Sequence, residues 1–208
     1  RVAVSPLFIE KGIRMEKSLT LEQVLEKNGN VSKLNVKYDT GCLNYCHYYE
    51  NQGKFKEKRY KNNSILEIGV KHEWGASSVK SWQEYFENSK IYGIDINPQN
   101  ADIEIDRCKV FIGAQQDIDF LTEVVLETGS FDIIIDDGSH VNSDIITSFE
   151  FLWSHLKKGG VYIIEDIHCT YAEISKAYGT KQTVNRKEFE NWLMDKVLKM
   201  HKNPDLMI

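Results

Sequence analysis

Two acidic clusters, each at the end of an apolar run, carry the residue types in this chain that could do chemistry. The first cluster spans residues 136–140 (DDGSH), and the second spans residues 165–168 (EDIH). Apolar runs rich in β-branched residues are typical of buried parallel strands, whose carboxyl ends form the ligand-binding edge of an α/β sheet. Carboxylates that converge there repel one another unless a cation or shared protons intervene. The pattern therefore predicts a site with a hard metal ion and a nearby base.

The segments that must position these clusters alternate between strand and helix patterns from Ser64 onward. Apolar runs predict strands at residues 65–69, 91–95, 110–112, 131–136 and 161–165. Apolar residues at helical spacing predict the connecting helices and a final helix. Residues 157–160 (KKGG) are expected to end the helix before the last strand, with Leu156 in its apolar stripe. We predict an α/β fold: a Rossmann-like, doubly wound, mainly parallel sheet with right-handed crossovers and helices on both faces.

Ahead of this alternating core lies a segment of different character. We predict an N-terminal helical and aromatic extension over residues 1–63 and a ligand-binding α/β domain over residues 64–208. In the extension, Leu21, Val24 and Leu25 lie on one face of a short helix, which Asn28 and Gly29 are expected to end.

Composition excludes several classes of protein. The chain has 208 residues and a formal net charge of −5, which disfavours a nucleic acid as the main partner. Its apolar runs are too short to span a bilayer, and its start shows no secretory signal. Its four cysteines, Cys42, Cys46, Cys108 and Cys169, are too few and too scattered for a disulfide framework. We therefore expect reduced thiols in a cytoplasmic protein.

Glycine and polar residues follow three successive predicted strands. Gly69 closes the first, and a glycine there lets a ligand approach the backbone closely. Asp95 closes the second, where a carboxylate can accept the hydroxyl protons of a ribose. Residues 113–117 (GAQQD) follow the third, although Asp117 by itself is more often a helix cap. Together these residues favour an adenosyl ligand, and the missing G-x-G-x-x-G fingerprint disfavours a nicotinamide enzyme.

Four segments resemble the class I S-adenosylmethionine-dependent methyltransferases: residues 66–70 (LEIGV), 91–95 (IYGID), 131–140 (FDIIIDDGSH) and 159–168 (GGVYIIEDIH). The last two add a closer resemblance to the metal-dependent sugar O-methyltransferases of macrolide and rhamnosyl antibiotic tailoring, and to the related proteins long labelled cephalosporin hydroxylases. The resemblance runs from about Tyr38 to Met200, and the combined D-D-G-S-H and E-D-I-H pattern is its specific part. It implies a sheet of the methyltransferase type, of which the terminal strands are not present in this sequence.

The resemblance also implies a role for each matching position. The family's metal site, usually filled by magnesium, falls on Asp137, Glu165 and Asp166, and its general base falls on His140. The cofactor-binding segments of the family match the positions of these residues: Glu67, Gly69, Asp95, Gln115, Asp117 and Asp136. The cofactor implied is S-adenosylmethionine, with S-adenosylhomocysteine as the product. The metal would be Mg²⁺ or Mn²⁺, because both suit sites built from oxygen ligands.

The implied reaction is methylation of a hydroxyl on a sugar or glycosylated small molecule. A cation held by carboxylates acidifies the hydroxyl, and His140 could take its proton because free histidine titrates near pH ~6.5. Tyr45 and Tyr49 could contact the sugar by stacking on its C–H faces, or could simply pack on the sheet. His168 could be a further substrate contact or a loop histidine. A homo-oligomer is possible, with the tyrosine segment at its interface.

Two other functions stay open. A catechol-type O-methyltransferase also chelates a diol through a metal, but should need a flatter and more apolar pocket. A non-catalytic protein that binds an adenosyl ligand or serves in an assembly is disfavoured by the intact acidic and histidine residues.

Overall fold

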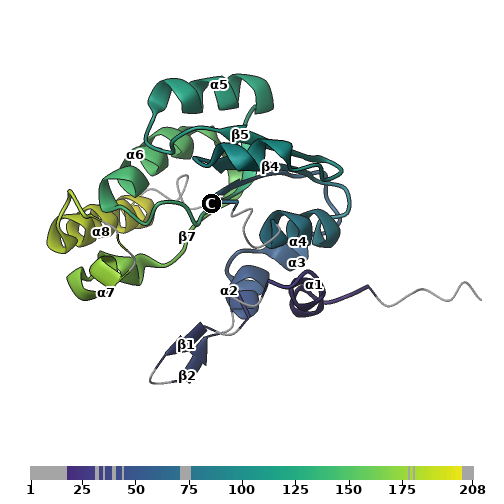
Figure 1. Ribbon diagram of the computed structural model, residues 1–208, viewed down its shortest axis with the longest axis horizontal. Coiled ribbons are helices and arrows are strands. Elements are labelled where there is room, and N and C mark those ends of the chain that lie inside the picture. The colour runs from purple at the N-terminus through teal and green to yellow at the C-terminus, as the bar shows by residue number, and fades with distance from the viewer. Residues whose placement is uncertain are drawn as a thin grey trace, which may run out of the picture.

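The computed structural model of this chain describes residues 18–30, 33–34, 36–38, 41–43, 45–70, 76–177, 179 and 181–202. Its main sheet has five parallel strands in the order β5-β4-β3-β6-β7 (Figure 1). The strands are β3 (Ser64–Ile68), β4 (Lys90–Asp95), β5 (Cys108–Ile112), β6 (Phe131–Asp136) and β7 (Leu156–Ile164). The strand order reverses between β3 and β6, and ligands bind at such switch points in open α/β sheets.

Helices cover both faces of this sheet (Figure 1). One face carries α1 (Leu21–Lys27), α2 (Tyr45–Asn51), α3 (Phe55–Lys58) and α4 (Ser77–Tyr85). The other carries α5 (Ile118–Thr128) and α6 (Asn142–Leu152), with α8 (Arg186–Lys202) packed against α6. The smaller elements are the antiparallel pair β1 (Val36–Tyr38) and β2 (Gly41–Leu43), the turns η2 (Pro98–Asp102) and η4 (Ile167–Thr170), and α7 (Ala172–Ala177). The predicted fold class is confirmed.

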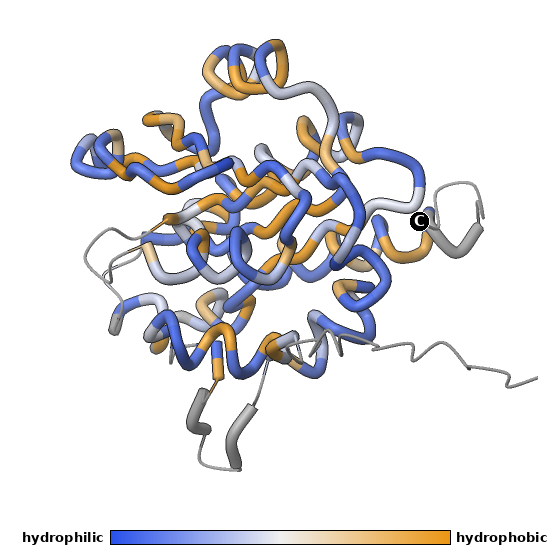
Figure 2. Tube along the Cα trace, turned by 90° about the vertical axis from the view of Figure 1, so that its right-hand side faces the viewer, coloured by the Kyte–Doolittle hydropathy of each residue, from blue (hydrophilic) through white to orange (hydrophobic). Residues whose placement is uncertain are grey.

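Alternation along each strand divides the core into two layers, and apolar residues run through the strands at the centre of the molecule (Figure 2). On β3, Ile65 packs in the layer under α1 and α4, whereas Leu66 and Ile68 pack in the layer under α5 and α6. The same period of two turns Glu67 toward α4, where it accepts a hydrogen bond from Ser78. Asp136 points to the opposite face and contacts Ser148 of α6. The two carboxylates therefore belong to different parts of the site.

β7 begins earlier than the sequence predicts, and the expectation for residues 156–160 was wrong. The preceding helix ends at Leu152 and continues as the turn η3 (Trp153–His155), after which Leu156 already belongs to the strand. Pairing with β6 shifts register between Phe131 and Ile133. Gly159 has a φ of +77°, which a glycine adopts without strain and which suits an irregularity of this kind. The glycines therefore serve the strand and do not end the helix.

The N-terminal helices α1, α2 and α3 pack on the α4 face of the sheet, whereas β1 and β2 project away from it (Figure 1). Thr20 caps α1 through a capping box with Gln23, and the apolar side chains of α1 are buried, which confirms the predicted helix. Cys46, Cys108 and Cys169 are free thiols, and the side chain of Cys42 lies outside the described ones. Within the described part of the chain, the helices are too short or too polar to cross a membrane.

Candidate active site

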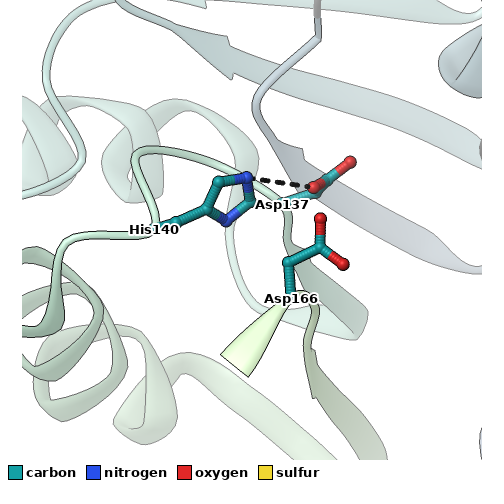
Figure 3. A group of neighbouring side chains, drawn as sticks. All are labelled: Asp137, His140 and Asp166. Atoms are coloured by element: carbon teal, nitrogen blue, oxygen red, sulfur yellow. Dashed lines mark ion pairs between the residues drawn. The ribbon is translucent and has the colours of Figure 1, made fainter. Parts of the chain in front are cut away.

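The loops that follow β6 and β7 bring two carboxylates and one imidazole together at the carboxyl edge of the sheet. Asp137, His140 and Asp166 each place one ligand atom within 4.8 Å of the other two (Figure 3). The His140 Nε2 atom lies 3.7 Å from Asp137 Oδ1. His140 and Asp166 have φ values of +55° and +52°, so both loops turn sharply at a left-handed residue. Strain of this kind is common at functional sites.

The chemistry of this group fits a divalent cation. Asp137 and Asp166 offer carboxylate oxygens, the ligands that hard cations prefer, and His140 adds an imidazole nitrogen. The side chains of Asp137 and His140 are each 14% exposed, so an ion can reach them from solvent. Tyr45 donates a hydrogen bond of 3.0 Å to Asp166 Oδ1, and His168 Nδ1 lies 3.9 Å from the same oxygen. His168 therefore stands beside the site rather than on a distant loop.

Glu165 lies apart from this group. Its Oε1 atom accepts hydrogen bonds from Lys33, at 2.6 Å, and from the hydroxyl of Tyr49. Tyr49 is buried and packs against the rings of Phe55 and Trp82. The role of Glu165 as a metal ligand, which the resemblance implies, stays a prediction.

Lys33 is a residue of this site that the sequence analysis did not predict. Its side chain is 3% exposed, and its ammonium lies 2.6 Å from Glu165, 3.2 Å from Asp137 and 3.8 Å from Glu67. Burial lowers the pKa of Lys33, but the carboxylates of Asp137 and Glu165 more than offset this and hold it well above its usual value. Lysine is rarely buried unless it is paired, and no sequence pattern distinguishes Lys33 from a surface lysine. Only the fold reveals it.

Tyr45, Tyr48 and Tyr49 line a cavity of about 470 Å³ beside the metal group. Glu165, Asp166 and their neighbours at the end of β7 also line it. Tyr48 is 51% exposed, whereas the hydroxyls of Tyr45 and Tyr49 point at carboxylates. The predicted contacts of Tyr45 and Tyr49 with a sugar stay predictions, and the cavity gives them a location.

A second cavity, of about 250 Å³, lies at the strand-order reversal on the other side of Asp137. Gly69, Asp95 and Gln115 line it. Asp95 Oδ2 accepts the backbone N–H of Val70, and Oδ1 accepts that of Asn97, both at 2.8 Å. Each carboxylate oxygen can accept a further hydrogen bond. The carboxylate is thus held in place at the wall of this cavity.

Gly69 lines the smaller cavity and packs against the backbone of Asp137. Its φ is +91°, and a Cβ atom there would lie 2.2 Å from the carbonyl oxygen of Asp137. Any side chain would therefore collide with the backbone that carries the first metal-site carboxylate. The sequence analysis expects a ligand to approach this glycine, whereas the approach seen here is that of the chain itself, and the ligand contact stays a prediction.

Asp136 and Gln115 form a buried network behind the smaller cavity. Gln115 Nε2 donates to both Asp136 oxygens, at 3.1 and 3.2 Å, and Ser148 donates to one of them at 3.0 Å. Gln115 Oε1 in turn accepts the N–H of Ser139, in the loop that leads to His140. Burial raises the pKa of Asp136 to about 6. Asp136 thus fixes the position of Gln115, which lines the smaller cavity.

Two other predicted cofactor residues have structural partners. Asp117 caps α5 by accepting the backbone N–H groups of Asp119 and Phe120, the alternative that the sequence left open. Glu67 is fully buried, and burial raises its pKa to about 7. Its Oε2 accepts from Ser78, while Oε1 has no hydrogen-bond partner among the described residues. Their contacts with a cofactor remain predictions.

Gln182 was also missed from the sequence, and it ties the two loops together. Its Nε2 donates to the backbone carbonyls of His140, at 2.8 Å, and Cys169, at 3.3 Å. Its Oε1 accepts the N–H of Asn142 at 2.7 Å. One amide thus holds the left-handed turn at His140 against the loop that follows β7.

Gln182→Ala is expected to lower the catalytic rate of this site by about tenfold, because small misplacements of catalytic groups are costly. Gln182→Glu should behave similarly, since it keeps the acceptor for Asn142 but loses both donated hydrogen bonds. Gln99→Ala, at an exposed position, is the control. Initial rates with a fixed acceptor test this, and wild-type rates in both Gln182 variants would contradict it.

The sequence of this chain is similar to those of known methyltransferases. Residues 66–167 match the family model described as a methyltransferase domain. The chain is 37% identical over 148 residues to mycinamicin VI 2''-O-methyltransferase of Micromonospora griseorubida, covering 68% of this chain and 37% of that protein. It is 41% identical over 121 residues to demethylmacrocin O-methyltransferase of Streptomyces fradiae, covering 56% of this chain and 30% of that one.

The fold of this chain is also similar to that of a methyltransferase of known structure. The MycE methyltransferase of mycinamycin biosynthesis, in complex with Mg, S-adenosylhomocysteine (SAH) and mycinamycin VI, superposes with a TM-score of 0.70 at 28% identity. The match covers 88% of this chain and 49% of that chain. This chain thus spans half or less of the length of these relatives. The predicted resemblance is confirmed: residues 66–167 match a methyltransferase domain model, and the chain is similar to O-methyltransferases of macrolide sugars.

Proposed function

We propose that this protein is an S-adenosylmethionine-dependent, divalent-metal-dependent O-methyltransferase that acts on a hydroxyl of a sugar or glycosylated small molecule. The observation that carries the proposal is the group Asp137, His140 and Asp166, set between two cavities. The smaller cavity, with Gly69 and Asp95, would hold the cofactor. The larger one, with its tyrosines, would hold the acceptor. The relatives named above are O-methyltransferases of mycinamicin VI and demethylmacrocin, which supports a glycosylated small molecule as the acceptor.

In this mechanism each residue has a defined task. Asp137 and Asp166 would hold Mg²⁺ or Mn²⁺, with Glu165 as a further candidate ligand. When bound, the cation supplies positive charge that lowers the pKa of a coordinated hydroxyl. His140 accepts the proton of that hydroxyl. Asp95 accepts hydrogen bonds from the ribose hydroxyls and so fixes the cofactor, while Tyr45 and His168 border the acceptor. Much of the rate enhancement comes from this positioning.

The remaining predictions complete the proposal. Residues 1–63 form an extension that supplies Lys33, Tyr45 and Tyr49 to the methyltransferase domain of residues 64–208. The protein acts in the cytoplasm, as its cysteine usage suggests. Its partner is a small glycoside rather than a nucleic acid or a membrane, and a homo-oligomer is compatible with these features.

Titration calorimetry with SAH tests the cofactor half of the proposal. Asp95→Ala is expected to weaken SAH binding at least about tenfold, since a hydrogen bond to a charged group contributes ~1.5–3 kcal/mol. Asp95→Asn keeps one oxygen and should lie between Asp95→Ala and the wild type. Asp106→Ala, at a side chain that is 81% exposed, is the matched control. An SAH affinity that none of these changes alters, in folded variants, would refute the assignment of the cavity.

A panel of rhamnosyl and deoxysugar glycosides, assayed with and without Mg²⁺, tests the catalytic half. Methylation that requires Mg²⁺ supports the proposal. SAH binding without turnover of any acceptor, in the presence of Mg²⁺ and Mn²⁺, would instead favour a non-catalytic role.

A further inference from the structure

Lys33 places a positive charge inside the acidic cluster that is proposed to hold the metal. Its ammonium contacts Glu165 at 2.6 Å and Asp137 at 3.2 Å, and the rings of Tyr49 and Trp82 lie 5.9 Å away. The lysine side chain is 3% exposed, so water scarcely screens these contacts. The chain itself thus supplies a cation where converging carboxylates require one.

The two oxygens of Asp137 face different partners. Oδ2 faces Lys33, whereas Oδ1 faces His140 and the proposed metal position. Glu165 is more fully engaged, because Lys33 and Tyr49 both donate to the same oxygen, Oε1. A divalent ion that takes Glu165 as a ligand must therefore share this carboxylate with Lys33 or draw it away from Lys33. An ion that leaves Glu165 in place is still repelled by the ammonium behind Asp137.

We propose that Lys33 is a built-in cation that competes with the divalent metal for the carboxylates of Glu165 and Asp137, and that it thereby sets the metal affinity of the site. This inference rests on the metal-dependent function proposed above. It assigns the N-terminal extension a direct part in metal binding. It also explains why Glu165 lies apart from the group formed by Asp137, His140 and Asp166.

Binding of Mn²⁺, followed by the electron paramagnetic resonance signal of the free ion without cofactor or acceptor, tests the proposal. Lys33→Met removes the charge and is expected to tighten Mn²⁺ binding at least about tenfold, since unit charges a few ångströms apart interact by several kcal/mol at partly buried sites. Lys33→Gln also removes the charge but keeps a donor for Glu165. It should shift in the same direction and covers the case in which Lys33→Met does not fold.

Lys27→Met is the matched control, because Lys27 also pairs with a glutamate, Glu84, but its side chain is 60% exposed. Its Mn²⁺ affinity should equal that of the wild type. The double variant Lys33→Met with Glu165→Gln should lose most of the gain in Mn²⁺ affinity. The reason is that this gain comes from the Glu165 carboxylate, which Lys33 no longer holds. A gain that persists in full without Glu165 would overturn the competition for that residue.

Mn²⁺ affinities in Lys33→Met and Lys33→Gln that equal or fall below the wild-type value would overturn the inference and leave the proposed function standing. Absence of Mn²⁺ binding in every variant would overturn both the inference and the metal dependence. SAH titration of the same samples reports on the cofactor site separately, so the two failures can be told apart.

Discussion

Replacing His140 by alanine is expected to lower the rate of methyl transfer by about 10²- to 10⁴-fold, the usual contribution of a general base. The imidazole lies 3.7 Å from Asp137 Oδ1, at the carboxyl edge of the sheet. Two other basic groups are described near this position: the ammonium of Lys33, which is engaged with Glu165, and His168, whose Nδ1 lies 3.9 Å from Asp166 Oδ1. Without His140, proton removal from the acceptor hydroxyl is left to His168 or to water.

Single-turnover transfer of a labelled methyl group measures this effect. His155→Ala is the matched control, because His155 lies in η3 and contacts the ring of Phe151, away from the metal group. SAH affinity should stay unchanged in both variants. Wild-type rates in His140→Ala and Asp137→Ala together would refute the proposed chemistry.

His140 also belongs to the group that could hold a metal, so its two roles need to be separated. Mn²⁺ binding does this. If His140 is the base, His140→Ala loses its rate but keeps its Mn²⁺ affinity to within a few-fold. A loss of affinity as large as that of Asp137→Ala would make His140 a ligand and would leave the reaction without an assigned base.

The sequence alone was sufficient to predict the strands and helices, because each has a local pattern of apolar residues. The runs that become β3, β4 and β6 are apolar enough to be read as buried strands, and each of them ends near the acidic residue or glycine that reaches the sheet edge. Because parallel strands end at the same edge, the meeting of Asp137 with Asp166 follows from the fold class. The alternation of strands and helices determined that class.

The features that the sequence did not reveal depend on contacts between distant loops. Lys33 and Glu165 are 132 residues apart, and Gln182 and His140 are 42 apart. No periodic pattern marks such pairs, since their side chains meet only after the sheet has formed. The error at residues 157–160 has a different cause: lysines followed by glycines suit the end of a helix and an irregular strand equally well.

Asp136→Asn is expected to remove a pH dependence of stability that the wild-type protein shows between about pH 4 and 6. Asp136 is 2% exposed, and its burial raises its pKa from 3.8 to about 6. The folded state therefore keeps a proton on this carboxyl over a range in which the unfolded state has released it. Stability linked to Asp136 is fully present below about pH 4 and is lost as the pH rises through 6.

At about 1.36 kcal/mol per pKa unit, this shift corresponds to roughly 3 kcal/mol of unfolding free energy lost between pH 4 and 6. Urea unfolding of both proteins at several pH values measures it. Glu67, whose pKa is also raised, adds a similar slope to both proteins, so the difference between them isolates Asp136. At pH 4 the variant should be the less stable, because an amide cannot satisfy the donors of Gln115, Ser148 and Gly138 equally well. Parallel curves for the two proteins would mean that Asp136 is ionised throughout, and that the network around Gln115 holds a charge rather than a proton.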